Sequence, residues 1–242
     1  MKISIAQTRP IKGDIAANIE KHLILAEIAA SYKANAIFFP ELSLTGYWAE
    51  LAIVLATNQD DTRLDVLQKL SDQKNITIGT GLPTRTNTGL RISMIIVQPN
   101  KNRLTYSKQL LFVDELPIFE KGDSQIILTI GNQKLAPAIC YESLQSVHSA
   151  TASNMGAEIY MASVAKTTQG IEKALSQYAE IAKKYAMPVF MSNCLGECDN
   201  FVGCGKSAVW NKQGQLVGQL DDETEGLIIF DTETEEVIKH SL

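Results

Sequence analysis

The sequence predicts an α/β fold in which mixed β-sheets are covered on the outside by helices. Two observations indicate this. Short runs of β-branched and apolar residues alternate with amphipathic helical runs, and several of the β-rich runs are joined by turn residues as hairpins. The chain has 242 residues, 45% of them hydrophobic, which is enough to bury a substantial core. Because no repeat, low-complexity tract or linker interrupts it, we expect a single domain over residues 1–242.

The first half of the chain alternates predicted strands and helices. Asp14 is a suitable N-cap for a helix over residues 15–32. The inner face of that helix is predicted from apolar residues at helical spacing, namely Ile19, Leu23, Ala26 and Ala30. A second helix over residues 62–74 turns leucines inward. Strands are expected over five runs, the last two paired through an NKN turn: residues 2–8, 36–39, 76–83, 91–99 and 103–108.

The second half predicts more hairpins around two further helices. A turn at Gly131 and Asn132 divides residues 124–140 into two strands. The remaining elements are two helices and several strands: helices over 146–155 and 170–185, strands over 158–163 and 188–193, and hairpin segments over 207–220 and 225–231. The acidic segments DDETEG and DTETEE indicate solvated turns and an exposed tail.

Composition excludes several classes of function. The 22 basic and 27 acidic residues give a net charge of −5, which disfavours a nucleic-acid partner. No apolar run reaches the roughly 18 residues that a membrane span needs. The N-terminal MKISIAQTRP enters a predicted strand without a signal peptide, so we expect a cytoplasmic protein without a membrane partner. In that compartment the four cysteines are expected to be reduced thiols.

Three polar residues stand at the ends of predicted strands, where side chains of such folds converge on a crevice. Glu41 follows the apolar run of residues 36–39, Lys108 closes RLTYSK, and Cys140 closes LAPAIC. Individually, each has an ordinary explanation, as a surface charge or a small buried thiol. Together they supply an acid, a cation and a nucleophile. The three histidines lie in predicted helices or the tail and support no cysteine–histidine pair: His22, His148 and His240.

The segments around these residues resemble the three signature segments of the nitrilase superfamily of carbon-nitrogen hydrolases. The segments are FFPELSLTGY, YSKQLLFVDELPIFEKGD and APAICYES, and their order and separation also fit. The later MPVFMSNCLG and GKSAVWNKQGQ are similar to the final strands of that family, so the resemblance spans nearly the whole chain. It implies an αββα sandwich of two mixed sheets flanked by helices, and pairing of subunits as a homodimer or a higher homo-oligomer.

The resemblance also implies a role for each polar residue. Glu41 would be the general base, Lys108 the cation that stabilises the tetrahedral intermediate, and Cys140 the nucleophile. Glu115 would be the second glutamate of the site, because DELP before an aromatic residue matches the family segment. Glu120 is the alternative for that position.

Amide chemistry explains why these residue types are needed. A free cysteine, with a pKa near ~8.5, is mostly protonated at neutral pH, so attack on an amide needs a base. Desolvation of Glu41 at the end of an apolar strand should raise its pKa toward the range useful for that purpose. Lys108 offsets the negative charges, and the backbone N–H of Tyr141 is the natural second donor to the oxyanion.

Other motifs give weaker hypotheses. Tyr47, Tyr141 and Lys166 are candidates for substrate binding; Tyr47 and Tyr141 lie near a catalytic candidate in sequence, and Lys166 lies in a segment where substrate-reading groups are expected. Cys194, Cys198 and Cys204 have three thiols but no CxxC pair, so core or loop thiols are favoured over zinc. The GKS at residues 205–207 lacks the glycine that a phosphate-binding loop requires five residues earlier.

The sequence therefore predicts a carbon-nitrogen hydrolase that cleaves a non-peptide amide-type bond through a cysteine thioester and needs no cofactor or metal. The alternatives are a nitrilase or acyl transferase with the same site, and a non-catalytic binding or scaffold protein that keeps the fold. The intact set of Glu41, Lys108 and Cys140 argues against the scaffold. We expect a small-molecule amide as substrate, and no residue identifies which one.

Overall fold

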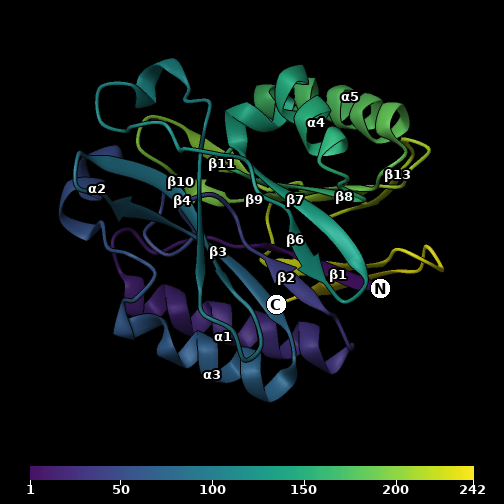
Figure 1. Cartoon of the computed structure of the whole chain (residues 1–242), viewed down its shortest axis with the longest axis horizontal. Coiled ribbons are helices and arrows are strands. Elements are labelled where there is room, and N and C mark those ends of the chain that lie inside the picture. The colour runs from purple at the N-terminus through teal and green to yellow at the C-terminus, as the bar shows by residue number, and fades with distance from the viewer.

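The computed structural model describes residues 1–242 as four layers, helix, sheet, sheet and helix (Figure 1). Helices α1 (Ile15–Ser31) and α3 (Asp65–Lys74) cover one sheet, and α4 (Ser146–Asn154) and α5 (Thr168–Tyr185) cover the other. The predicted αββα sandwich of two mixed sheets is confirmed.

The first sheet has seven strands in the order β15-β14-β1-β2-β3-β4-β5. Its centre, β1 to β3, is parallel, and the strands on either side are antiparallel. β1 pairs with β14, so residues from the two ends of the chain lie side by side, with Lys2 opposite Asp231. The strands are β1 (Lys2–Gln7), β2 (Ala36–Phe38), β3 (Thr77–Arg85), β4 (Leu90–Val97), β5 (Leu104–Ser107), β14 (Gly226–Asp231) and β15 (Val237–Ser241).

The second sheet has six strands in the order β13-β12-β9-β8-β7-β6. Its centre, β7 to β9, is again parallel, and a separate hairpin of β10 and β11 lies beyond β9 in the chain. The strands are β6 (Leu128–Ile130), β7 (Gln133–Ile139), β8 (Ile159–Val164), β9 (Val189–Asn193), β10 (Leu195–Glu197), β11 (Val202–Cys204), β12 (Ala208–Trp210) and β13 (Leu216–Gln219).

Three apolar cores separate the layers. The core between the sheets joins side chains of both, including Phe38 from β2 and Phe190 from β9. Ser163 Oγ donates to Phe39 O over 2.5 Å, and Ser192 Oγ donates to Ala6 O over the same distance, so two hydrogen bonds also align the sheets. The second core lies under α1 and α3, and the third lies under α4 and α5.

The buried face of α1 differs from the predicted one. Ile19 and Ala26 are buried as expected, but Leu23 and Ala30 are only half-buried. His22 and Leu25 take part in the buried face instead. A helical pattern of apolar residues does not include a histidine. His22 is buried because both of its ring nitrogens have partners: Nδ1 lies 2.6 Å from Asn18 O, and Nε2 lies 2.9 Å from Ser43 Oγ.

Several short elements carry no sequence signal and were missed. Helix α2 (Ala49–Leu55) buries only Ala52 and exposes Ile53 and Val54, so it has no amphipathic pattern. The edge strand β15 was also missed: it follows the acidic segment DTETEE, whose residues 233–236 are exposed as expected, and its first residue Val237 is half-buried. Two 3₁₀ helices were also missed, η2 (Val113–Glu115) and η3 (Cys140–Leu144), whereas η1 (Thr62–Leu64) forms the first turn of the helix predicted over residues 62–74.

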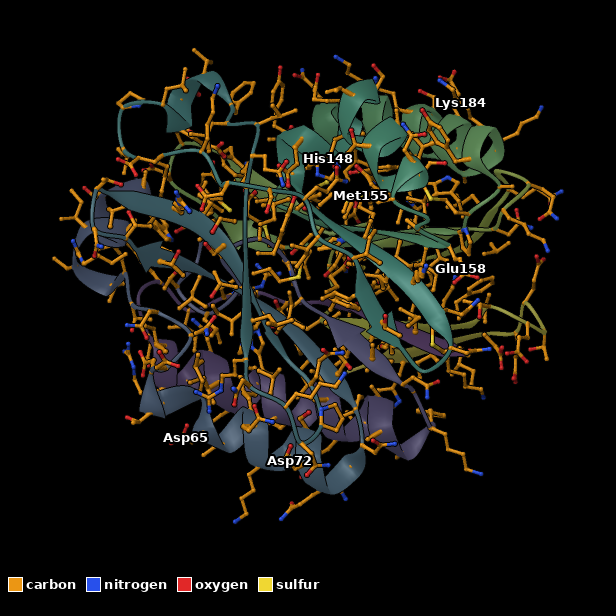
Figure 2. All side chains as sticks on the ribbon, viewed as in Figure 1. Asp65, Asp72, His148, Met155, Glu158 and Lys184 are labelled. Atoms are coloured by element: carbon orange, nitrogen blue, oxygen red, sulfur yellow. The ribbon has the colours of Figure 1, made fainter.

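Charged residues lie on the outer faces of α3 and α5. Asp65 and Asp72 on α3 and Lys184 on α5 are exposed on opposite sides of the molecule (Figure 2). No helix is both long enough and apolar enough to cross a membrane.

Candidate active site

Glu41 lies in a tight loop directly after β2. The loop is held by Leu44 N, which donates to Gly81 O over 2.9 Å, and by Gly81 N, which donates to Ser43 Oγ over 3.1 Å. A Cβ on Gly81 would stand 2.4 Å from Leu42 N, so this approach of β3 to the loop requires glycine. Glu41 is 2% exposed in consequence.

His22 supports this loop from α1. Burial lowers the pKa of His22 to about 3, so the ring is neutral. Its Nδ1–H can then donate only to the carbonyl of Asn18, which leaves Nε2 as the acceptor for the Ser43 hydroxyl. The buried histidine is therefore a support for the Glu41 loop.

Lys108 follows β5 and is fully buried. Its backbone N–H donates to Ile92 O over 2.9 Å, which extends the pairing with β4 by one residue. Its Nζ donates to Glu41 Oε1 over 2.8 Å and to Glu115 Oε1 over 2.5 Å. One ammonium group thus joins two buried carboxylates.

Glu115 is placed by the turn of η2. Phe112 N donates to Glu115 Oε2 over 2.7 Å, and the Tyr47 hydroxyl donates to Glu115 Oε1 over 2.7 Å. Glu120 lies elsewhere and accepts a hydrogen bond from the Thr88 hydroxyl at 2.7 Å. The geometry thus places Glu115, and not Glu120, beside Lys108.

Cys140 stands where β7 passes into η3, with a positive φ of 48° that non-glycine residues rarely adopt. Its Sγ lies 3.7 Å from Ala165 O at the end of β8, and the residue is half-buried. Ser143 Oγ donates to Cys140 O over 2.5 Å and also meets the Tyr178 hydroxyl at 2.6 Å. Tyr178 therefore supports the turn from below and is itself fully buried.

Glu142 ties the lysine segment to the cysteine turn and was missed by sequence reasoning. Its Oε1 accepts from Ile139 N over 2.8 Å and from the Tyr106 hydroxyl over 2.6 Å. Its Oε2 accepts from Gln109 N over 2.6 Å, directly after Lys108. The available signal was an acidic residue two positions after Cys140 in the segment APAICYES, because a carboxylate that is fully buried there needs several donors.

Burial dominates the electrostatics of the site. It raises the pKa of Glu41 to about 7, although the charge of Lys108 lowers it in part. Burial also raises the pKa of Cys140 to about 11, with the Glu41 charge acting in the same direction. Burial alone lowers the pKa of Lys108, but the charges around it, Glu41 foremost, raise it above its ordinary value. Glu41 Oε2 has no hydrogen-bond partner.

The three candidates for substrate binding have different surroundings. Tyr47 reaches the site through its bond to Glu115. Lys166 follows Ala165, whose carbonyl contacts the thiol. Tyr141 is 37% exposed, and its ring packs at 5.6 Å from that of Phe112 on the outside of the turn.

The remaining motifs form no second site. Cys194 and Cys198 place their Sγ atoms 3.8 Å apart, whereas Cys204 Sγ faces Asn193 Nδ2 at 3.8 Å. No group of three or more His, Cys, Asp or Glu side chains is arranged to hold a metal ion. Lys206 in the GKS segment pairs with Asp222 at the surface.

Two hollows of the surface do not contain the catalytic candidates. One of about 500 Å³ is lined by polar residues that include Asp60 and Arg103, and one of about 390 Å³ includes Tyr185 and Phe230. The candidate site is therefore identified by its chemistry and not by the size of a cavity.

Comparison with known proteins identifies the family of the chain and its structural neighbours. The family model described as carbon-nitrogen hydrolase matches residues 2–239. The chain belongs to that family. Among solved structures, this carbon-nitrogen hydrolase is similar to the NitN amidase from Nesterenkonia sp. AN1, with a TM-score of 0.87 at 22% identity over 96% of this chain and 92% of that one. The amidases of this comparison belong to the nitrilase superfamily.

Curated relatives have similar levels of sequence identity. The glutamine-dependent NAD(+) synthetase of Acinetobacter baylyi is 24% identical over 97% of this chain, and that of Thermotoga maritima is 23% identical over the whole chain. The chain spans 44% of the length of each of these two relatives. The arylacetonitrilase of Hypocrea virens is 21% identical over the whole chain and 86% of its own length.

Proposed function

We propose that this carbon-nitrogen hydrolase cleaves a small non-peptide amide through a thioester on Cys140. The observation that carries the proposal is a thiol on a strained turn beside a buried ammonium that joins two carboxylates, Glu41 and Glu115. The neighbouring amidase supports it, because structures of its glutamate-to-glutamine variant carry adducts of acrylamide and fluoroacetamide at the active-site cysteine.

In the first step, Sγ of Cys140 attacks the amide carbonyl while the thiol proton passes to Glu41. The unpartnered Oε2 of Glu41 is the atom that can accept it, because Oε1 is bonded to Lys108. The thiol is the weaker acid of the two, since its pKa lies near 11 and that of Glu41 near 7. Proton transfer therefore accompanies attack, and no stable thiolate forms beforehand.

The tetrahedral intermediate carries a negative oxygen that needs donors. Lys108 Nζ faces it as a buried cation, and the backbone N–H of Tyr141 adds a second donor directly after the nucleophile. The C–N bond then breaks, and the leaving nitrogen takes the proton from Glu41. The products of this half-reaction are ammonia or an amine and the acyl thioester.

Water completes the cycle. Glu41 removes a proton from the water as its oxygen attacks the thioester carbon, the C–S bond breaks, and the proton returns to the thiol. Glu115 is a positioning residue in this scheme, because it orients Lys108 and is itself held by Tyr47 and by Phe112 N. We further propose that the protein is cytoplasmic and, from the family resemblance, that it is a homodimer or a higher homo-oligomer.

The first test is ammonia release from a panel of amides, carbamoyl amines and nitriles. Cys140→Ala should abolish turnover. Cys204→Ala removes a thiol that is not one of the catalytic candidates and should retain turnover. Trapping of an acyl-enzyme on Cys140 by mass spectrometry distinguishes the enzyme from a non-catalytic scaffold. Turnover that survives Cys140→Ala would sink the proposal.

A second test separates the two carboxylates. Glu41→Gln cannot accept the thiol proton, so single-turnover acylation should fall by ~10²-fold or more. Glu115→Gln keeps the base and removes an orienting charge, so acylation should fall less. If Glu41→Gln acylates at the wild-type rate and Glu115→Gln does not acylate, the base has been assigned to the wrong carboxylate.

A further inference from the structure

The thiols of Cys194 and Cys198 are in contact with each other, without a third ligand that would make them a metal site. Their Sγ atoms lie 3.8 Å apart, and both side chains are buried. Residues four apart in an extended chain are separated by about 13 Å, so this contact requires a bend. Gly196 lies between the two cysteines and supplies the bend with a φ of 83°. Gly203 packs against Cys194 from the facing strand, since a Cβ there would stand 2.6 Å from Sγ.

Ala165 connects the thiol pair to the nucleophile. Cys194, Cys198 and Ala165 form a small apolar cluster of their own. The carbonyl oxygen of Ala165 lies 3.7 Å from Cys140 Sγ. Because protein interiors are close-packed, a movement of the paired sulfurs displaces the main chain that contacts the catalytic thiol.

Tyr47 connects the thiol pair to the catalytic lysine. It packs against the same cluster, and its carbonyl oxygen accepts from Asp199 N, directly after Cys198, over 2.8 Å. Its hydroxyl donates to Glu115, which also accepts from Lys108. The position of one thiol is therefore linked through hydrogen bonds to the buried ammonium group of the site.

The hairpin whose turn contains Cys198 covers the pair. Its strands β10 and β11 form a two-stranded sheet that belongs to neither large sheet, and such a hairpin has little stability of its own. In the closed hairpin, the hydrogen bond with Cys198 and then burial raise the pKa of Cys194, which keeps that thiol protonated and slow to react. Local opening of the hairpin is therefore the route by which a small oxidant reaches the sulfurs. The residues that flank this route are exposed: Glu197, Asp199, Asn200 and Val202.

We propose that Cys194 and Cys198 are modified reversibly by hydrogen peroxide, which joins them in a disulfide that slows the reaction of Cys140. Peroxide first oxidises one thiol to a sulfenic acid, and its O–O bond breaks with release of water. The second sulfur then attacks the first, the S–O bond breaks, and the second thiol proton leaves with the hydroxyl as another water. The two electrons lost by the sulfurs are those taken up by the peroxide. A dithiol reductant reverses the modification.

Formation of the disulfide changes the surroundings of the active site. The sulfurs move from 3.8 Å apart to about 2 Å. This shift pulls on the hairpin turn that holds Tyr47, and so on the hydrogen bond from Tyr47 to Glu115. Lys108 is then held less firmly beside Glu41, the group that accepts the proton of the catalytic thiol in our proposal. We therefore expect the oxidised protein to have a less reactive Cys140.

Peptide mapping after peroxide treatment tests for the disulfide. The test protein is Cys204→Ala, which removes the third thiol of the segment. Cleavage after Glu197 places Cys194 and Cys198 on different peptides, so only a disulfide joins them. Peroxide should give the joined peptides and dithiothreitol should separate them, whereas the double variant with Cys198→Ser should give none. Thermal melting confirms that both proteins are folded. Separate peptides after peroxide, with free thiols or sulfinic acids, overturn the inference.

Alkylation of Cys140 by iodoacetamide measures the effect on the active site. After catalase has removed the peroxide, the rate constant of the remaining Cys140 thiols should be about 10-fold lower than in the reduced protein, as for loss of one hydrogen bond to a charged group. Dithiothreitol should restore it, and Cys198→Ser should prevent the change. A disulfide that leaves this rate constant unchanged also overturns the inference. Neither measurement uses an amide, so failure to hydrolyse any amide would refute the proposed function alone.

Discussion

Replacement of Lys108 by methionine should destabilise the fold as well as abolish catalysis. Methionine keeps much of the apolar stem but removes the ammonium group that Glu41 and Glu115 share. Glu41 is 2% exposed and Glu115 is 3% exposed, so neither carboxylate can recover its lost partner by hydration. Removal of one member of a buried ion pair typically costs about 3–5 kcal/mol. For a chain of this length that corresponds to a fall in Tm of roughly 6–20 °C.

The penalty should depend on pH in a defined direction. The pKa of Glu41 is already raised from 4.5 to about 7 by burial, and the Lys108 charge lowers it in part. Without Lys108 the folded-state pKa lies further above the unfolded value. A group of this kind contributes its stability below the unfolded pKa and loses it as pH rises through the folded pKa. Lys108→Met should therefore be most destabilised near pH 8 and much less so near pH 5.

The free energy of unfolding of wild type and of Lys108→Met, measured in urea near pH 5 and near pH 8, tests this pH dependence. Lys206→Met is the control, because Lys206 pairs with Asp222 at the surface and its removal should change little. The double variant Glu41→Gln with Lys108→Met leaves only one buried carboxylate and should recover part of the loss. Equal unfolding free energies for wild type and Lys108→Met near pH 8, or a penalty independent of pH, would refute this account of the site.

Three further predictions, one for wild type and two for variants, test other parts of the site. The kcat/KM of wild type should rise with pH around a midpoint near 7, as Glu41 loses its proton; a midpoint near 4.5, the ordinary value, would contradict a buried base. Glu142→Gln leaves backbone donors such as Gln109 N without an acceptor and should cost about 1.5–3 kcal/mol in urea unfolding, with slower alkylation of Cys140; wild-type values for both would remove its positioning role. Tyr47→Phe deletes the donor to Glu115 and should lower kcat more than it raises KM, whereas an effect on KM alone would assign the hydroxyl to substrate binding.

The layered fold was predictable because its strands and long helices carry regular patterns. The hairpin of β4 and β5 and the capped start of α1 were visible in residue spacing and turn chemistry. The buried face of α1 was harder to predict, because His22 is buried only with the partners that Asn18 and Ser43 supply. Ser43 belongs to a loop 21 residues away in the chain, and such a contact has no local signature.

Contacts between distant segments of the chain also limited the prediction of the candidate site. Glu41, Lys108 and Cys140 stand at strand ends, so the fold brings them together once the strands are recognised. Glu142 was missed because its role depends on donors from two other segments, Gln109 N and the Tyr106 hydroxyl.

The pairing of β1 with β14 delays completion of the first sheet until late in synthesis. Ser4 Oγ donates to Ile228 O across 224 residues, and β14 is adjacent to the strand that lies beside β2, which carries the Glu41 loop. The ribosome delivers Glu41 and Lys108 early, but the sheet that holds them stays open until residues 226–231 emerge. Closure over so long a separation is entropically costly, so the final step of folding should be slow compared with local helix formation. A nascent chain that already contains Cys140 should therefore still lack the complete sheet that positions Glu41 and Lys108.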